Sequence, residues 1–266
     1  METKLKMMIA VVNNKGGVAK TTTVQNLAAG MMRKDKKLKI LVVDLDPQCN
    51  LTLLMHAPQN CATIFESMVE CKGLPVYKNE IGVYFVPGSA KMQDIDPFLQ
   101  KTGAPRQVFG ACLDSNCIDM TGEGINNPID FFDYILIDCP PALSKNTYNA
   151  LVAASKVLVP VQMEALSVKG VDEILGVMEE VKEFHMNDNL EMLGLLPVMV
   201  DERTNITKEL KQLLSAKHGT DVLPCRIRRC VKLVEAQACG KSIFEYAPYS
   251  SAGIDYEKAI KIMFNI

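Results

Sequence analysis

The sequence predicts an α/β protein built on a mostly parallel, twisted sheet with helices on both faces. Short apolar runs alternate with segments of helical period, which is the pattern of a parallel sheet covered on both sides. The length of 266 residues and the apolar content of 48% are enough for one large buried core. The expected strands are Met7–Asn13, Lys39–Asp44, Val83–Val86, Tyr134–Asp138, Val157–Pro160 and Leu193–Val200.

Two segments between these strands have clear helical patterns. Residues 21–34 follow the first strand, and Ser167–Phe184 follow the fifth. Residues 103–130 are rich in Gly, Pro, Asn and Cys, so we expect an irregular excursion there. We find no linker or internal repeat, and we expect residues 1–266 to form a single domain.

The loop between the first strand and the first helix reads NNKGGVAKTT, residues 13–22. A phosphate cradle is built at such a place, because backbone N–H groups and the positive end of the helix point at one anion. A plain glycine-containing turn is the alternative, but the sequence K-G-G-x-x-K-T-T in this context favours nucleotide phosphates. The loop residues expected to bind nucleotide are Gly16, Gly17, Val18, Ala19, Lys20, Thr21 and Thr22.

The side chains of this loop have distinct expected roles. Gly16 and Gly17 let the backbone approach a phosphate without a Cβ in the way. Lys20 supplies a positive charge between the β- and γ-phosphates. Thr21 offers a hydroxyl to Mg²⁺, and Thr22 contacts the α-phosphate.

The loop departs from the pattern G-x-x-x-x-G-K-[ST] at both outer glycines, where Asn14 and Ala19 stand. If the backbone at Ala19 has a positive φ, alanine costs about 1 kcal/mol and should weaken nucleotide binding. If φ is negative, the cost is small.

Acidic residues follow two of the expected strands. Asp44 and Asp46 end the strand in VVDLDPQCN, and Asp138 follows the apolar run YILI. The carboxyl ends of parallel strands form the ligand crevice, where buried acids are costly without a cation or a reaction to serve. Asp138 fits water-mediated Mg²⁺ binding. A turn capped by Asp is the alternative interpretation of Asp44 and Asp46, but the match of their spacing to the loop disfavours it. For Cys139 we prefer a buried thiol to a redox or iron-sulfur ligand.

Composition excludes several classes of protein. A formal net charge of −2 excludes a uniformly basic nucleic-acid coat. No run approaches the roughly 18 apolar residues of a membrane-spanning helix, and no signal peptide is present, so we expect a cytoplasmic protein. Nine cysteines without CxxC pairs indicate reduced thiols, and three scattered histidines make a structural zinc site improbable.

KGGVAKTT resembles the deviant Walker A motif, K-G-G-x-G-K-[ST], of the ParA/MinD family of P-loop ATPases, and NNKGGVAKTTTVQNLA is most similar to its partitioning branch. DLDPQCN resembles the family segment D-x-D-P-Q-x-N, and DCPP resembles its D-x-P-P switch II. The similarity continues through most of the chain, with residues 103–130 as the chief exception.

The resemblance implies site residues beyond those that the loop suggests. It implies that Lys15 reaches across a dimer interface to the nucleotide of the partner subunit, that Asp44 helps to organise the metal site, and that Asp46 positions the attacking water. The implied catalytic residues are therefore Lys15, Lys20 and Asp46, and the implied metal site consists of Thr21, Asp44 and Asp138. Where relatives often have I-P-R, this chain has Ile227, Arg228 and Arg229, so the residues that read the base stay open.

A basic segment supplies the electrostatic evidence for a partner. Between Arg203 and Lys241, nine basic residues face three acidic ones in a chain of net charge −2. A solvated charged face is the alternative, but the asymmetry favours one anionic surface partner, namely DNA bound through its backbone. The residues expected to contact DNA are Arg229 and Lys232, with Arg203 and Arg228 as helpers.

The function expected from the resemblance is ATP-dependent DNA partitioning. It implies a homodimer formed around ATP and Mg²⁺, nonspecific DNA binding on the nucleoid, and slow hydrolysis stimulated by a ParB-like centromere-binding protein. The first strand begins at Met7, so we expect no winged-helix domain before it. The alternatives are a MinD-like ATPase positioned on a membrane and a nucleotide-gated scaffold with negligible turnover. We expect no membrane binding, because Ala259, Ile260 and Met263 of the last helix should dock on the core.

Overall fold

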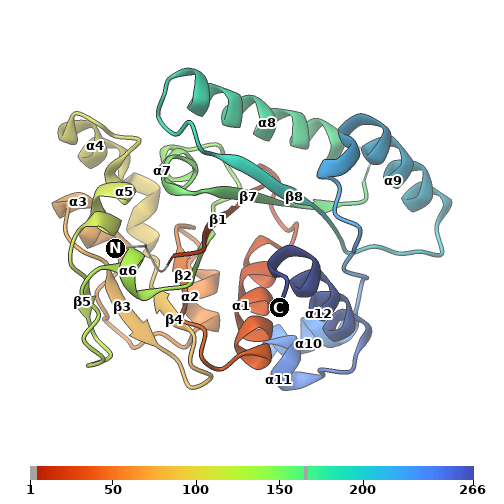
Figure 1. Ribbon diagram of the computed structural model, residues 1–266, viewed down its shortest axis with the longest axis horizontal. Coiled ribbons are helices and arrows are strands. Elements are labelled where there is room, and N and C mark those ends of the chain that lie inside the picture. Colours follow the sequence, from red (N-terminus) through yellow and green to blue (C-terminus); the bar gives the residue numbers. More distant parts are fainter. Residues whose placement is uncertain (1–4, 165–166) are drawn as a thin grey trace.

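The computed structural model describes residues 5–164 and 167–266, in which eight strands form one sheet between two layers of helices (Figure 1). The strands are β1 (Met7–Val11), β2 (Ile40–Asp44), β3 (Pro75–Lys78), β4 (Tyr84–Val86), β5 (Ile118–Asp119), β6 (Tyr134–Asp138), β7 (Lys156–Gln162) and β8 (Glu191–Val198).

Twelve α-helices connect and cover the strands of the described chain. They are α1 (Lys20–Lys34), α2 (Asn50–Leu54), α3 (Ile64–Glu70), α4 (Asp96–Leu99), α5 (Val108–Asp114), α6 (Pro128–Phe131), α7 (Lys145–Ala153), α8 (Ser167–Glu183), α9 (Asn205–His218), α10 (Val231–Ala238), α11 (Ile243–Tyr246) and α12 (Ser251–Phe264).

The strand order is β5-β3-β4-β2-β6-β1-β7-β8, and β3 with β4 is the antiparallel pair. The predicted α/β class and the mostly parallel sheet are therefore confirmed. All six predicted strands are present, and their ends lie within two residues of the expected positions. We did not predict β3 and β5, which are four and two residues long.

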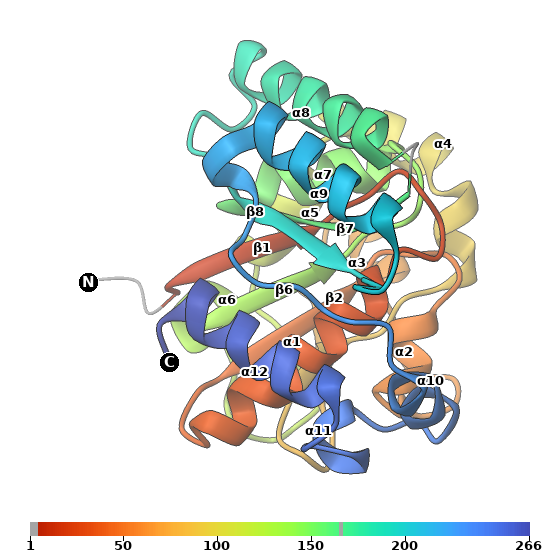
Figure 2. The same ribbon diagram turned by 90° about the vertical axis from the view of Figure 1, so that its right-hand side faces the viewer.

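Alternate residues of the central strands enter separate cores on the two faces of the sheet. Ile9 and Val11 of β1 pack with α1 and α12 on one face. Met8 and Ala10 pack with α5, α7 and α8 on the other. Figure 2 shows α8 on one side of the sheet and α1 with α12 on the opposite side. The period of two in a strand explains this division.

The C-terminal helix α12 belongs to the first of these cores. Ala259, Ile260 and Met263 are buried there, which confirms their predicted docking. In the part of the chain that the structure describes, no helix is both long and apolar enough to cross a membrane. All nine cysteines are free thiols, as predicted, and Cys139 is buried.

The stretch 103–130 is more ordered than its composition suggests. It contains α5, β5 and α6, joined by turns that include Gly122 and Gly124 at positive φ. Phe109 and Cys112 of α5 are buried in the core. Long-range packing therefore orders a segment whose local sequence favours turns. Whether residues 1–266 behave as a single domain stays a prediction.

Candidate nucleotide site

Three carboxylates meet at the carboxyl edge of the sheet. In the parallel ladder Asp44 of β2 lies directly opposite Asp138 of β6, and Val11, the last residue of β1, lies on the other side of Asp138. Asp46 follows two residues after Asp44, and all three acids are buried. The loop after β1 therefore begins beside the carboxylates of two neighbouring strands, as the spacing of the motifs predicted.

The loop turns into α1 through two residues in the left-handed region, Gly17 at φ 73° and Ala19 at φ 60°. Lys20 then opens the helix, and its ammonium folds back over the loop. Its Nζ donates to the carbonyl oxygens of Asn13 at 3.0 Å and Lys15 at 3.1 Å. Burial lowers the pKa of Lys20, while the nearby Asp138 carboxylate favours the charged form.

The backbone conformation of Ala19 shows whether this residue is strained. The φ of 60° confirms the conditional prediction that alanine is strained here. The strain belongs to the folded loop, so we expect it to reduce the free energy of unfolding.

Ala19→Gly should therefore raise the free energy of unfolding by about 1 kcal/mol, because glycine adopts positive φ without a Cβ clash. ATP affinity should change less than about twofold, since the substitution should relieve the strain at residue 19 equally in the ATP-free and ATP-bound protein. Urea unfolding and isothermal titration calorimetry measure the two quantities. Ala29→Gly is the matched control, because it lies inside α1 and should destabilise by about 1 kcal/mol. A destabilised Ala19→Gly would contradict the argument.

The carboxylates fit a divalent cation. Asp138 is 1% exposed, and its two oxygens make no well-formed hydrogen bond in the described structure, although the nearby Thr21 hydroxyl acts to lower its pKa. Burial and the neighbouring Asp44 raise the pKa of Asp138, and burial raises the pKa of Asp44 to about 6. An unpartnered buried carboxylate of this kind is what a hydrated Mg²⁺ beside bound phosphates would satisfy.

The three predicted metal-site residues are not equivalent. Asp44 Oδ2 already accepts hydrogen bonds from the Thr52 backbone N at 2.8 Å and from its hydroxyl at 2.6 Å. Thr21 lines the cleft, and Asp138 has free acceptors. Among the described residues, no three His, Cys, Asp or Glu side chains are arranged to enclose a metal alone. Mg²⁺ usually retains waters and phosphate ligands, so Thr21 and Asp138 are the better placed of the three.

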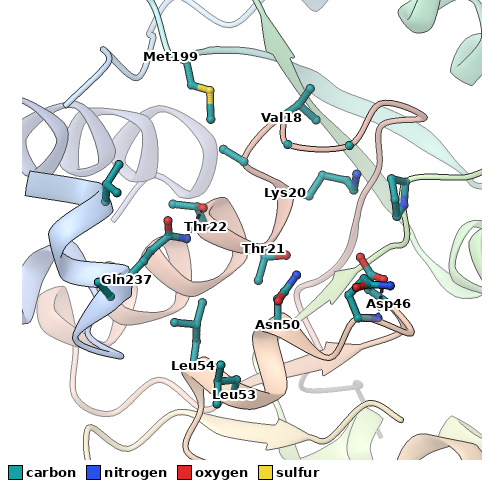
Figure 3. A pocket seen from close by; sticks show the side chains of 17 residues that line it. Val18, Lys20, Thr21, Thr22, Asp46, Asn50, Leu53, Leu54, Met199 and Gln237 are labelled. Carbon is teal, nitrogen blue, oxygen red and sulfur yellow. Dashed lines mark hydrogen bonds between the residues drawn. The ribbon is translucent and has the colours of Figure 1, made fainter. Parts of the chain in front are cut away.

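A cleft of about 710 Å³ extends from the loop to a second wall (Figure 3). Gly16 to Thr22 line one end together with Asp46. The far wall is mainly apolar, which suits the faces of a purine base. That wall comes from α2, the end of β8 and α10, and consists of Leu53, Leu54, Met199, Val234, Gln237 and Ala238.

Sequence reasoning missed this wall. It left open which residues read the base, and Arg228, which stands where relatives often have a proline, does not line the cleft. Its guanidinium instead makes a two-bond ion pair with Asp255, at 2.8 and 2.7 Å. The wall residues lie in three separate parts of the chain, and no local motif marks them as neighbours.

Gln237 connects the two ends of the cleft. Its Nε2 donates to the Thr22 hydroxyl at 2.6 Å, and Figure 3 shows the side chain reaching from its helix towards the start of α1. A threonine hydroxyl has one proton and two lone pairs. Since Thr22 accepts from Gln237, its own proton stays available for a phosphate oxygen.

Lys15 does not line this cleft. Its Nζ forms an ion pair with Glu164, and both side chains are substantially exposed. The preceding Asn14 donates from Nδ2 to Glu173 of α8. Lys15 is therefore not among the residues that line the cleft of its own chain.

Asp46 lies between two cavities. It lines the nucleotide cleft and also a second cavity of about 410 Å³ that Pro140 and Pro141 border. Its Oδ1 accepts from the Gln48 backbone N at 2.9 Å. The carboxylate thus stands at the phosphate end of the cleft, next to the loop after β6.

More positive charges of the basic segment are paired with carboxylates than the composition of the segment suggests. Arg203 pairs with Asp201, Arg226 with Glu202, and Lys232 with Glu235 at 2.8 Å. Asp201, Glu202 and Asp255 lie outside the segment from Arg203 to Lys241, so the sequence count omitted them. The side chains of Lys208 and Lys211 lie outside the described residues.

Like Lys241, Arg229 is exposed and has no ion pair within the described part of this segment. Its backbone N donates to the Val200 carbonyl at 3.0 Å, which fixes the chain beside the end of β8. Arg203 and Arg229 both lower the pKa of Asp201, to about 2, so these two cations lie on one surface. Of the four expected DNA contacts, Arg229 is the freest and Arg228 the most restrained.

Comparisons with known proteins agree with this geometry. A family described as an AAA domain (AAA_31) matches residues 6–192. The chain is 35% identical over 254 residues to the chromosome-partitioning ATPase Soj of Thermus thermophilus, covering 94% of this chain and 92% of Soj. It is 32% identical over 250 residues to the sporulation initiation inhibitor protein Soj of Bacillus subtilis, covering 91% and 92%.

Among solved structures, the chain is similar to cobyrinic acid a,c-diamide synthase from Mycobacterium smegmatis with a bound ATP analogue and magnesium. The TM-score is 0.77 at 26% identity, with 97% of this chain and 93% of that chain covered.

Proposed function

We propose that this protein acts in DNA partitioning. The proposal starts from its family, because the chain belongs to the Soj/ParA family of AAA-domain ATPases. It is an ATPase, and its cofactors are ATP and magnesium. The observation that carries the finer proposal concerns the second lysine of the loop, Lys15, which pairs with Glu164 and does not line the cleft that Lys20 occupies.

The phosphate end of the cleft holds ATP through fixed donors. The loop from Gly16 to Thr22 and the start of α1 direct backbone N–H groups to one place, and Lys20 adds the buried positive charge. Thr21 and Asp138, supported by Asp44, would hold Mg²⁺, which neutralises charge on the β- and γ-phosphates. Asp46 accepts a proton from the attacking water and holds that water in line.

Lys15 has a role only between chains. We propose that it leaves Glu164 and reaches the nucleotide of a second copy, where it stabilises charge on the transferring phosphoryl group. A cation supplied in this way acts only after the dimer has formed. Dimerisation and hydrolysis are thereby coupled to bound ATP.

In the ATP-bound dimer we propose nonspecific DNA binding through Arg229 and Lys232, with help from Arg203 and Arg228. A ParB-like centromere-binding protein would stimulate hydrolysis and release the DNA. We place this cycle on the nucleoid, in the cytoplasm. The support is the coverage of 92% of the partitioning relative Soj, together with the exposed, unpaired Arg229.

Two variants test the dimer proposal. Asp46→Ala should accumulate an ATP-bound dimer, because the phosphate site survives while the water loses its guide. Lys15→Gln should still bind ATP as a monomer and should lose at least about 100-fold in partner-stimulated hydrolysis. Light scattering with ATP and Mg²⁺ measures the mass of the particle and so distinguishes monomer from dimer. Phosphate release measures the rate of ATP hydrolysis.

The outcomes separate the candidate functions. A monomeric Asp46→Ala, or full activity in Lys15→Gln, would remove the inter-chain role of Lys15. Wild-type protein that pelleted with liposomes in ATP would favour a MinD-like role, which the burial of Ala259 and Ile260 does not favour. ATP binding without phosphate release, even with DNA and a partner protein, would favour a scaffold.

A further inference from the structure

Helix α10 is anchored by unusually little apolar surface. Ala236 is its one buried residue and the partly buried Leu233 packs against the same core, whereas Val231 is 71% and Val234 is 66% exposed. A helix of eight residues with so little burial is not held by hydrophobic packing alone. Its position therefore depends strongly on polar contacts.

Polar contacts hold the segment that contains α10 at both ends, and within the helix the Tyr246 hydroxyl donates to Glu235 at 3.0 Å. Before the helix, the Arg228 guanidinium is bound by Asp255 of α12. Near its end, Gln237 donates to the Thr22 hydroxyl at 2.6 Å. The residues between these anchors include Arg229 and Lys232, the two principal DNA contacts of the proposed function.

The second anchor lies in the nucleotide cleft. Thr22 belongs to the first turn of α1, and Val234, Gln237 and Ala238 line the same cleft. Helix α10 therefore lines the nucleotide cleft with some of its residues and also carries an exposed basic side chain, Lys232. No other described element both lines this cleft and carries a principal DNA contact.

We propose that Gln237 is a positioning residue that couples occupancy of the nucleotide cleft to the placement of α10, and through it to Arg229 and Lys232. When a phosphate oxygen accepts the Thr22 proton, the hydroxyl is polarised and becomes a better acceptor for Gln237. The bound base adds contacts to Val234 and Ala238. Nucleotide thus stabilises one position of α10 more than others, which is the differential interaction that such a shift needs.

This coupling rests on the proposed DNA binding and deepens it. Dimer formation raises affinity by presenting the basic surface twice. Gln237 acts within each subunit, so its contribution persists when the amount of dimer is held constant.

The test compares wild type with Gln237→Leu at saturating non-hydrolysable ATP analogue and Mg²⁺. Light scattering establishes equal dimer, and fluorescence anisotropy measures affinity for a random duplex. We expect Gln237→Leu to bind DNA about 3- to 10-fold more weakly, the equivalent of removing one hydrogen bond. Gln107→Leu, on the exposed N-terminal side of α5, is the matched control and should match wild type.

Hydrogen exchange provides a readout that does not need DNA. Analogue should slow amide exchange across residues 231–238 in wild type and Gln107→Leu, and should do so much less in Gln237→Leu. Equal protection in wild type and Gln237→Leu, or equal DNA affinity at equal dimer, would overturn the coupling. If wild type shows the protection but binds no DNA, the coupling stands and the proposed DNA function fails.

Discussion

Lys20→Ala is expected to abolish ATP binding, with a loss of at least about 100-fold in affinity. Lys20 is the one basic side chain among the residues that line the cleft, and only 7% of it is exposed. Removing one partner of a buried charged contact costs about 3–5 kcal/mol, which corresponds to a factor of 100 or more. Isothermal titration calorimetry with ATP and Mg²⁺ measures the loss directly.

A matched control separates this effect from a general change in charge. Lys34 ends the same helix, far from the loop, where it pairs with Glu257 at 2.8 Å. Lys34→Ala should leave ATP affinity unchanged, because surface ion pairs contribute little. If Lys20→Ala kept micromolar affinity, the cleft would not be a phosphate site of the kind proposed.

The phosphate end of the site could be predicted because its geometry is local. A strand, a glycine-containing loop and a helix follow one another within 28 residues, so their spacing alone places Lys20 and Thr21. The meeting of Asp44 with Asp138 needs only that β2 and β6 be parallel neighbours that end together. The acids that end the two apolar runs predict that they share the carboxyl edge of the sheet, whereas the pairing of β2 with β6 is known only from the structure.

The base end could not be predicted because it depends on distant packing. Leu54, Met199 and Gln237 come from three regions that share no motif, and the fold alone brings them together. Distant packing also determines which charged side chains are paired, and the sequence does not show this. A count along the sequence could not show that Arg228 is engaged by Asp255, which lies 27 residues away. Long-range pairs of this kind change which cations remain available to a ligand.

Charge reversal at Arg229 and Lys232 is expected to abolish DNA binding while ATP binding and dimerisation persist. Neither residue lines the nucleotide cleft, and Lys232 shares its charge only with the exposed Glu235. Binding to phosphates releases counterions, so the log affinity of the wild type should fall against log salt with a slope of about 0.9 for each phosphate that it neutralises. A dimer carries each residue twice, which multiplies the effect. Anisotropy titrations across a salt series measure both affinity and slope.

The control for this prediction carries the same change in charge elsewhere. Lys36 and Lys37 are exposed in the turn between α1 and β2, at the opposite edge of the sheet from the nucleotide. Reversing both should lower affinity only slightly, through net charge, and should leave the salt slope near that of wild type. If the Arg229→Glu, Lys232→Glu protein bound DNA at moderate salt as tightly as wild type, the basic segment would be a solvated face. Partitioning would then rest on the nucleotide site and the family relationship alone.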